Sequence, residues 1–239
     1  MPERLPAFHA CEDDARAALL ATALALSGEH AQASGLTGCT RLSLRWGRSG
    51  AEGFLIVRAT LASPGSTLDD IVWLALDDCR QPAGTGPIQE RETLEPPAAW
   101  RLHQDIYRRR REVGAIIGSR PPFCTTLACL ARVQRDGIPA FHPDVACVGG
   151  DSIRCAAHAP VDWPATAQPQ AFCEHVAAAL KDRAACLLAG RGLLATGATL
   201  RAAAELSAEV ERLARIYWQV LCVEPFEAVP VNQAPGAFS

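Results

Sequence analysis

The segment from Val113 to Phe123 constrains the fold more than any other part of this 239-residue chain. Its apolar run ends at Ile117, and a Pro-Pro break then leads into a helical stretch near Cys124. Between the run and the break stand Gly118, Ser119 and Arg120. An apolar run of this length predicts a buried strand, and α/β proteins bind their ligands at such strand ends. We therefore predict a functional site at the end of this strand.

Helical and strand patterns alternate along the whole chain without a linker between them. The predicted helices cover residues 12–28, 98–107, 124–131, 172–180 and 200–222. The other predicted strands cover residues 42–46, 54–57, 71–76, 185–188 and 192–195, the first two as a hairpin. Residues 81–97 and 139–169 are predicted to be irregular. The alternation predicts one α/β domain over residues 1–239, with helices covering a central mixed sheet and with flexible ends at 1–10 and 225–239.

Composition excludes several classes of partner. The chain is 49% hydrophobic and 21% charged, as expected of an ordinary globular protein, and its net charge is −3. This balance favours neither nucleic acid nor an anionic membrane surface. Four arginines at 108–111 form the only basic run, and we interpret them as the solvated end of the preceding helix. The N-terminus lacks the apolar core of a signal peptide and no apolar run is long enough to span a bilayer, so we expect a cytoplasmic protein.

The ten cysteines are spread through apolar segments and form no Cys-x-x-Cys pair. Most stand where alanine or valine would fit, which predicts buried thiols that pack as small hydrophobic residues. This interpretation covers Cys124, Cys129, Cys147, Cys173, Cys186 and Cys222. Cys155 lies nearer the expected site, but no base is spaced to activate it.

Several further motifs occur in an order and spacing that resemble the class II aldolase/adducin family over about residues 12–222. They include a Trp-Arg-Leu-His helix that begins at Trp100 and carries Tyr107, and a Gly-Gly-Asp-Ser-Ile segment that begins at Gly149. The remaining matches are 138–142, 174–177, 179–181, 187–188 and 192–193. The resemblance implies the three-layer α/β fold of that family.

In the family that the chain resembles, three histidines hold a catalytic zinc and a glutamate acts as acid and base. Carried over position by position, the glutamate falls on Ala99 and the three histidines fall on Gly118, Arg120 and Arg191. Alanine and glycine have no ligating side chain, and a guanidinium offers only N–H donors. The resemblance therefore implies that no catalytic residue remains at these positions, that no zinc is bound and that no cofactor is needed.

The family's phosphate-binding elements are also substituted. Residues 38–39, 59–60 and 97–98 stand at the places of the Gly-Asn, Thr-Gly and Ser-Ser pairs of the family, and His158 stands near the place of a tyrosine. A substrate phosphate would lose hydroxyl and amide donors there. The substitutions gather in the site while the core motifs persist, as in a pseudoenzyme or in a site rebuilt for another ligand.

Two arginines now occupy the places of zinc ligands. If they face each other in a partly buried cleft, the burial of like charges favours an anion between them. We predict a small anionic ligand bound by Arg120, Arg191, Ser119 and His158, held by bidentate guanidinium contacts. The alternatives are a protein carboxylate from Glu90, Glu92 or Glu95, or rotation of the arginines to solvent. His103 and His142 lack the spacing of a metal site, so we interpret both as structural.

Three functions remain open at this point. The first is a binding or interaction protein without aldolase activity. The second is an enzyme with a rebuilt, metal-independent lyase or isomerase site, in which His158, Tyr107 or Cys155 acts as acid or base. The third is a metal-dependent sugar-phosphate aldolase that uses other ligands, such as His103, His142 or His158. The resemblance also implies a homo-oligomer, a cyclic tetramer with sites between subunits.

Overall fold

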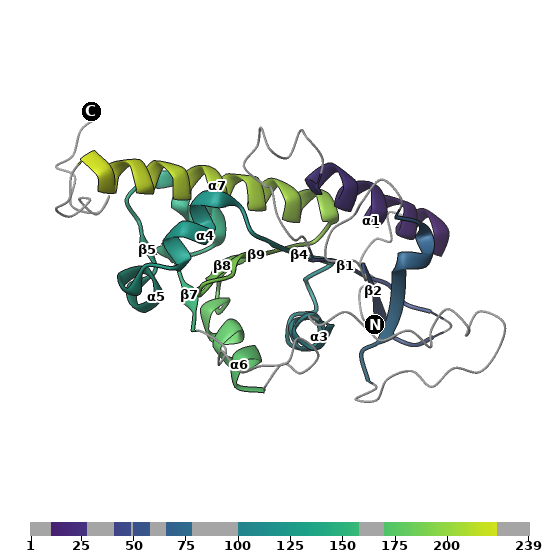
Figure 1. Ribbon diagram of the computed structural model, residues 1–239. Helices are drawn as coiled ribbons and strands as arrows, with labels where there is room; N and C mark the ends of the chain where they lie inside the picture. The colour runs from purple at the N-terminus through teal and green to yellow at the C-terminus, as the bar shows by residue number, and fades with distance from the viewer. Residues whose placement is uncertain are drawn as a thin grey trace, which may run out of the picture.

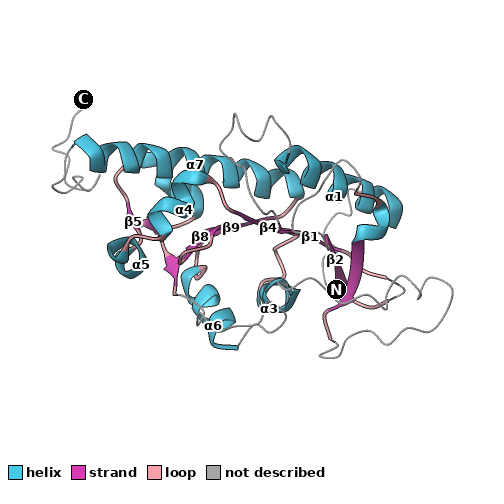
Figure 2. Cartoon of the chain, viewed as in Figure 1, coloured by secondary structure: helices cyan, strands magenta, loops and turns pink. Residues whose placement is uncertain are grey.

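A computed structural model describes residues 11–27, 41–48, 50–57, 66–77, 100–157 and 170–223. The predictions for the two chain ends, for the segment 81–97, for Ala99 and for His158 lie outside these residues. Figures 1 and 2 show a central sheet with helices on both faces. This is the single-domain α/β arrangement that the sequence predicts.

The sheet has seven strands in the order β3-β2-β1-β4-β9-β8-β7. Their bounds are β1 Arg41–Arg45, β2 Gly53–Val57, β3 Ile71–Ala75, β4 Ala115–Ser119, β7 Cys155–Ala156, β8 Ala185–Leu188 and β9 Gly192–Gly197. All neighbours are antiparallel except β7 and β8, which are parallel, so the sheet is mixed. The predicted β1–β2 hairpin is confirmed. The strand β4 lies at the centre, between β1 and β9.

Each face of the sheet is covered by its own set of helices. In Figure 1, α1 (Glu12–Ser27) and α7 (Leu200–Val223) lie above the sheet, while α3 (Trp100–Arg109) and α6 (Gln170–Ala179) lie below it. The helix α4 (Pro122–Ala128) follows β4 directly and packs against α7. The chain thus turns at the end of β4 from the sheet to the α7 layer.

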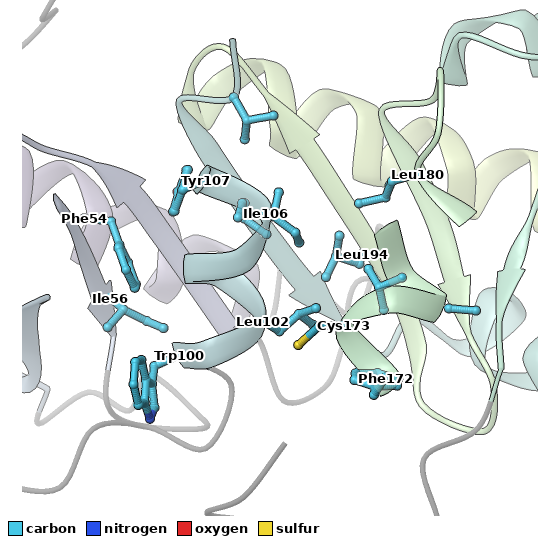
Figure 3. Packing of buried hydrophobic residues seen from close by; sticks show 14 of the residues in the cluster. Phe54, Ile56, Trp100, Leu102, Ile106, Tyr107, Phe172, Cys173, Leu180 and Leu194 are labelled. Carbon is cyan, nitrogen blue, oxygen red and sulfur yellow. The ribbon is translucent and has the colours of Figure 1, made fainter. Parts of the chain in front are cut away.

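The core divides along these faces because successive strand residues point to opposite sides. On the lower face, residues of β2, β4 and β9 pack against α3 and α6, as Figure 3 shows for Phe54, Ile106, Phe172 and Leu194. On the upper face, Leu42 and Ile117 pack against α1. The alternation fixes which face each residue near the end of β4 can reach.

Two parts of the chain are more regular than the sequence predicts. The predicted helix at 124–131 ends at Ala128, and a second short helix, α5, covers Ala131–Asp136. The predicted irregular stretch after residue 139 contains short elements in its described part, namely β5 Ile138–Pro139, η2 Pro143–Val148, β6 Ser152–Ile153 and β7. Strands of two residues are too short to carry a periodic signal.

The prediction that the cysteines are buried is correct only in part. Cys124, Cys173 and Cys186 are buried, but Cys129, Cys147 and Cys222 are exposed. The three exposed thiols lie near the ends of their helices, where the sequence stays mostly apolar although the residues no longer pack against the core. Among the helices that the structure describes, none is long and apolar enough to cross a membrane.

Candidate functional site

The strand β4 and the turn between β8 and β9 bring two of the predicted site residues together. Gly118 and Ser119 end β4, and Arg120 follows directly. A turn closed by the bond from the Arg191 N–H to the Leu188 carbonyl places Arg191 just before β9. Since β9 pairs with β4, the residue after Arg191 lies beside the end of β4.

Gly192 makes this approach close. Its φ is +118°, and a Cβ at this position would collide with the Ser119 carbonyl oxygen and lie 3.0 Å from the Arg120 Cα. Only glycine fits both the backbone conformation and the space. The backbones that carry Arg120 and Arg191 are therefore held against each other.

The surroundings of the two arginines differ from the sequence prediction. Arg120 is exposed, whereas Arg191 is half-buried with its guanidinium carbon 5.9 Å from the centre of the Phe172 ring. No carboxylate in the described part of the chain forms an ion pair with either arginine. Because Arg120 is exposed, the two like charges are not buried together and do not by themselves require an anion between them. Both guanidiniums carry donors that a ligand can use.

Ser119 lies on the other side of the sheet from this site. Its side chain is 5% exposed, and its Oγ is 3.4 Å from the Oγ of Ser207 on α7. Because Ser119 has the same parity as Ile117, its hydroxyl faces the α7 layer. We therefore correct the prediction for this residue: Ser119 belongs to the packing of α7 rather than to the ligand contacts.

A buried polar cluster lies under β1, on the face that carries Gly118. The Oγ of Ser43 is 2.6 Å from the Nδ1 of His103 and 2.8 Å from the Tyr107 hydroxyl. Burial, with a smaller effect of the nearby charge of Arg41, lowers the pKa of His103 to about 3. His103 is therefore a neutral, hydrogen-bonded residue of the core, in agreement with the structural interpretation. His142 caps η2 by accepting a hydrogen bond from the Asp144 N–H.

Sequence reasoning missed a buried carboxylate behind the site. Glu211 of α7 is 3% exposed and accepts hydrogen bonds of 2.9 Å from the N–H groups of Phe123 and Cys124, at the start of α4. Desolvation raises the pKa of Glu211, against the effect of the two N–H donors. Its position among Val210 and Leu213 of the apolar stripe was the available signal. Glu211 holds the segment after Arg120 to α7.

Two candidate acids or bases of the rebuilt-enzyme hypothesis are poorly placed. Tyr107 is fully buried against Phe54, and desolvation raises its pKa above the usual range. Burial also raises the pKa of the Cys155 thiol to about 11. A neutral phenol without solvent access and an un-ionised thiol are weak general bases at neutral pH.

The described residues at this strand end do not fit a zinc ion such as the one that the resembled family binds. Gly118 has no side chain, and Arg120 and Arg191 can only donate hydrogen bonds. Within the described ranges, no three His, Cys, Asp or Glu side chains gather closely enough to hold a metal ion. The donor set of this strand end suits an anion better than a cation.

Known proteins with similar sequences belong to the family that the fold and the motifs resemble. The chain belongs to the class II aldolase/adducin family, because residues 19–218 match the family described as Class II Aldolase and Adducin N-terminal domain. It is 37% identical over 200 residues, 81% of each chain, to a 5-methylthioribulose-1-phosphate/5-deoxyribulose-1-phosphate aldolase of Rhodospirillum rubrum. It is 33% identical over 198 residues to the L-fuculose phosphate aldolase of Escherichia coli K12, covering 80% of this chain and 82% of that protein.

A solved structure of an L-fuculose 1-phosphate aldolase superimposes with a TM-score of 0.71 and 25% sequence identity, and the match covers 95% of both chains. The fold therefore agrees over nearly the whole length.

Proposed function

We propose that this protein binds a small anionic ligand at the end of β4 through Arg120 and Arg191, and that it has lost zinc-dependent aldolase activity. The observation that carries the proposal is the close approach of the two backbones at Gly192, which brings two arginines to one strand end. Paired guanidiniums bind carboxylates and phosphates through bidentate hydrogen bonds. Neither arginine is neutralised by a carboxylate in the described part of the chain.

The packing around the site supports binding without chemistry. Arg191 rests on the face of Phe172, and Glu211 fixes the chain that follows Arg120. The backbone at both arginines is thus held by neighbouring elements, which reduces the backbone entropy lost on binding. The side chains at this strand end, those of Arg120 and Arg191, are guanidiniums and not the carboxylates, imidazoles or thiols that commonly act as general acid or base.

The names of the relatives suggest the chemistry of the ligand. The curated relatives are called aldolases of methylthioribulose, deoxyribulose and fuculose phosphates. We infer that the ligand of this chain retains a phosphate, which suits arginine.

The same names favour a second candidate, a sugar-phosphate aldolase with metal ligands other than those expected. That alternative requires ligands from outside the described residues or from another subunit. It predicts that the metal content and the aldolase activity of the protein increase together when metal is added.

Titration calorimetry in buffer containing EDTA tests the proposal, with glycerol 3-phosphate as the probe. We expect saturable binding, which Arg120→Gln or Arg191→Gln weakens about 10-fold to 100-fold, the effect of losing a charge-assisted contact. The matched control is Arg201→Gln, which removes an arginine on the exposed side of α7. Binding that survives both site variants would contradict the proposal, as would aldol cleavage that depends on added metal.

Assembly and location complete the proposal. We infer a cytoplasmic homotetramer from the family resemblance. Sedimentation analysis measures the assembly directly, and a monomer at micromolar concentration would contradict that part.

A further inference from the structure

The guanidinium of Arg191 has a ring contact but no hydrogen-bond partner within the described part of the chain. Only the backbone N–H of this residue is bonded, to the Leu188 carbonyl. Arg191 is half-buried, yet the Thr125 hydroxyl is the one buried side-chain polar group of the described residues that lacks a partner. The unpaired nitrogens of Arg191 therefore reach the protein surface, where a ligand has access to them.

A ring contact leaves the N–H groups of a guanidinium free. The group is planar and its N–H bonds point outward in that plane, so a ring against one face does not occupy them. The guanidinium carbon of Arg191 lies 5.9 Å from the centre of the Phe172 ring. Arg45 shows a different arrangement, because it lies 4.9 Å from the centre of the Tyr107 ring but also donates to the Val113 and Tyr107 carbonyls. The donors of Arg45 serve the fold, whereas those of Arg191 remain free.

Phe172 is itself fixed by the core. It belongs to α6, is 4% exposed and packs in the same cluster as Leu194, on the lower face of the sheet that Figure 3 shows. Leu188 packs against that cluster too, and its carbonyl accepts the Arg191 N–H. The backbone and the guanidinium of Arg191 are thus attached to the same part of the core, one through the turn and the other through the ring.

We propose that Phe172 is a positioning residue of the anion site, whose ring holds the Arg191 guanidinium by one face so that its N–H edge meets the ligand. This inference rests on the proposed function. An arginine side chain loses rotamer freedom when it binds a ligand, and a contact that already restricts the side chain reduces this loss. The ring contact raises the affinity about threefold to tenfold, as expected of a partly buried cation–π pair.

A double-mutant cycle tests the inference, with glycerol 3-phosphate as the probe in calorimetric titrations that contain EDTA. Phe172→Leu removes the ring but keeps an apolar side chain, and it should weaken binding about threefold to tenfold. Phe172→Tyr keeps the ring and should bind within about twofold of the wild-type protein. In the Arg191→Gln background, Phe172→Leu should change the affinity by less than about twofold, because the guanidinium that the ring holds is absent.

The matched control is Phe54→Leu, which removes another ring from the same core cluster. Phe54 packs against Tyr107, so this variant should lose stability and keep the wild-type affinity. Circular dichroism and the melting temperature establish that each variant is folded. Phe172→Met, which also removes the ring, takes the place of Phe172→Leu if that variant is unfolded.

The possible outcomes separate this inference from the proposed function. Equal weakening by Phe172→Leu in the wild-type and Arg191→Gln backgrounds would overturn the inference, since the ring would then act through packing alone. Wild-type affinity in Phe172→Leu, or a Phe172→Tyr variant as weak as Phe172→Leu, would overturn it as well. In these cases the anion site stands as long as Arg191→Gln weakens binding. If the wild-type protein does not bind the probe, or if Arg191→Gln binds it unchanged, the proposed function fails and this inference fails with it.

Discussion

Polar side chains inside the fold and those at the end of β4 differ in whether they have partners within the protein. Inside, Ser43 contacts His103 and Tyr107, and Glu211 accepts two backbone N–H groups. At the strand end, Arg120 and Arg191 have no carboxylate partner among the described residues. These buried side chains are hydrogen-bonded within the fold, because a buried unpaired group is costly, and the Thr125 hydroxyl is the one buried side-chain group of the described residues that lacks such a bond. Arg120 is exposed and carries no such cost, so its charge is available to a ligand.

The same comparison bears on the family fold and on the proposed loss of the family chemistry. The structure matches an L-fuculose 1-phosphate aldolase over 95% of the chain, while Gly118, Arg120 and Arg191 stand at the positions that the family resemblance assigns to zinc ligands. Conserving a packed core does not require conserving a metal site, since stability and chemistry depend on different residues.

The largest expected effect on stability is at Gly192, where the start of β9 lies against the end of β4. In Gly192→Ala, the Cβ collides with the Ser119 carbonyl oxygen at a φ of +118°. We expect the free energy of unfolding to fall by about 3 kcal/mol, measured by urea denaturation. The matched control is Gly50→Ala, at a φ of +86° with nothing within 4 Å of the new Cβ, which should cost about 1 kcal/mol. Equal losses in the two variants would show that the close approach at Gly192 is not essential.

The next effect concerns the buried carboxylate. In Glu211→Gln, one of the two acceptors of the Phe123 and Cys124 N–H groups becomes a donor. We expect a loss of about 2 kcal/mol in the free energy of unfolding, as for removal of a helix cap with a buried group left unpaired. Glu205→Gln, on the exposed side of the same helix, should leave it unchanged. An unchanged stability in Glu211→Gln would mean that α4 needs no cap from α7.

A smaller effect is expected from pH. His103 has a pKa of about 3 in the folded protein, well below its ordinary value of 6.5, so the unfolded chain binds one more proton between these values. Stability is therefore complete above about pH 6.5 and falls as the pH decreases toward 3. We expect a difference of about 1 kcal/mol between pH 6 and pH 5 from this group. In His103→Asn, the difference in the free energy of unfolding between pH 6 and pH 5, measured by urea denaturation, should shrink by that amount. An unchanged pH dependence would contradict a buried neutral histidine.

The smallest stability effect belongs to the strand end. Arg120 is exposed and has no ion pair with a described carboxylate, so Arg120→Gln should change the free energy of unfolding by no more than about 0.5 kcal/mol. The same variant should lose ligand affinity. A large loss of stability in Arg120→Gln would place this residue with the fold rather than with the ligand.

Periodicity predicts the elements of this fold well, because strands and helices of five or more residues carry their own pattern. It predicts β4, the β1–β2 hairpin and α7 within a few residues. The contacts of Glu211 with the start of α4 join residues 87 or 88 positions apart, and the Ser43–His103 contact joins residues 60 apart. No local pattern contains such pairs. The side of the sheet on which Ser119 lies likewise required the register of β4.

Metal content tests the central claim most directly. Untagged protein produced in medium supplemented with zinc, manganese and cobalt, then dialysed, is measured by elemental analysis. If the ligating histidines of the family are replaced here by Gly118, Arg120 and Arg191, as we propose, metal will be substoichiometric in every preparation. About one metal ion per chain surviving dialysis would contradict the account and would favour the metal-dependent aldolase.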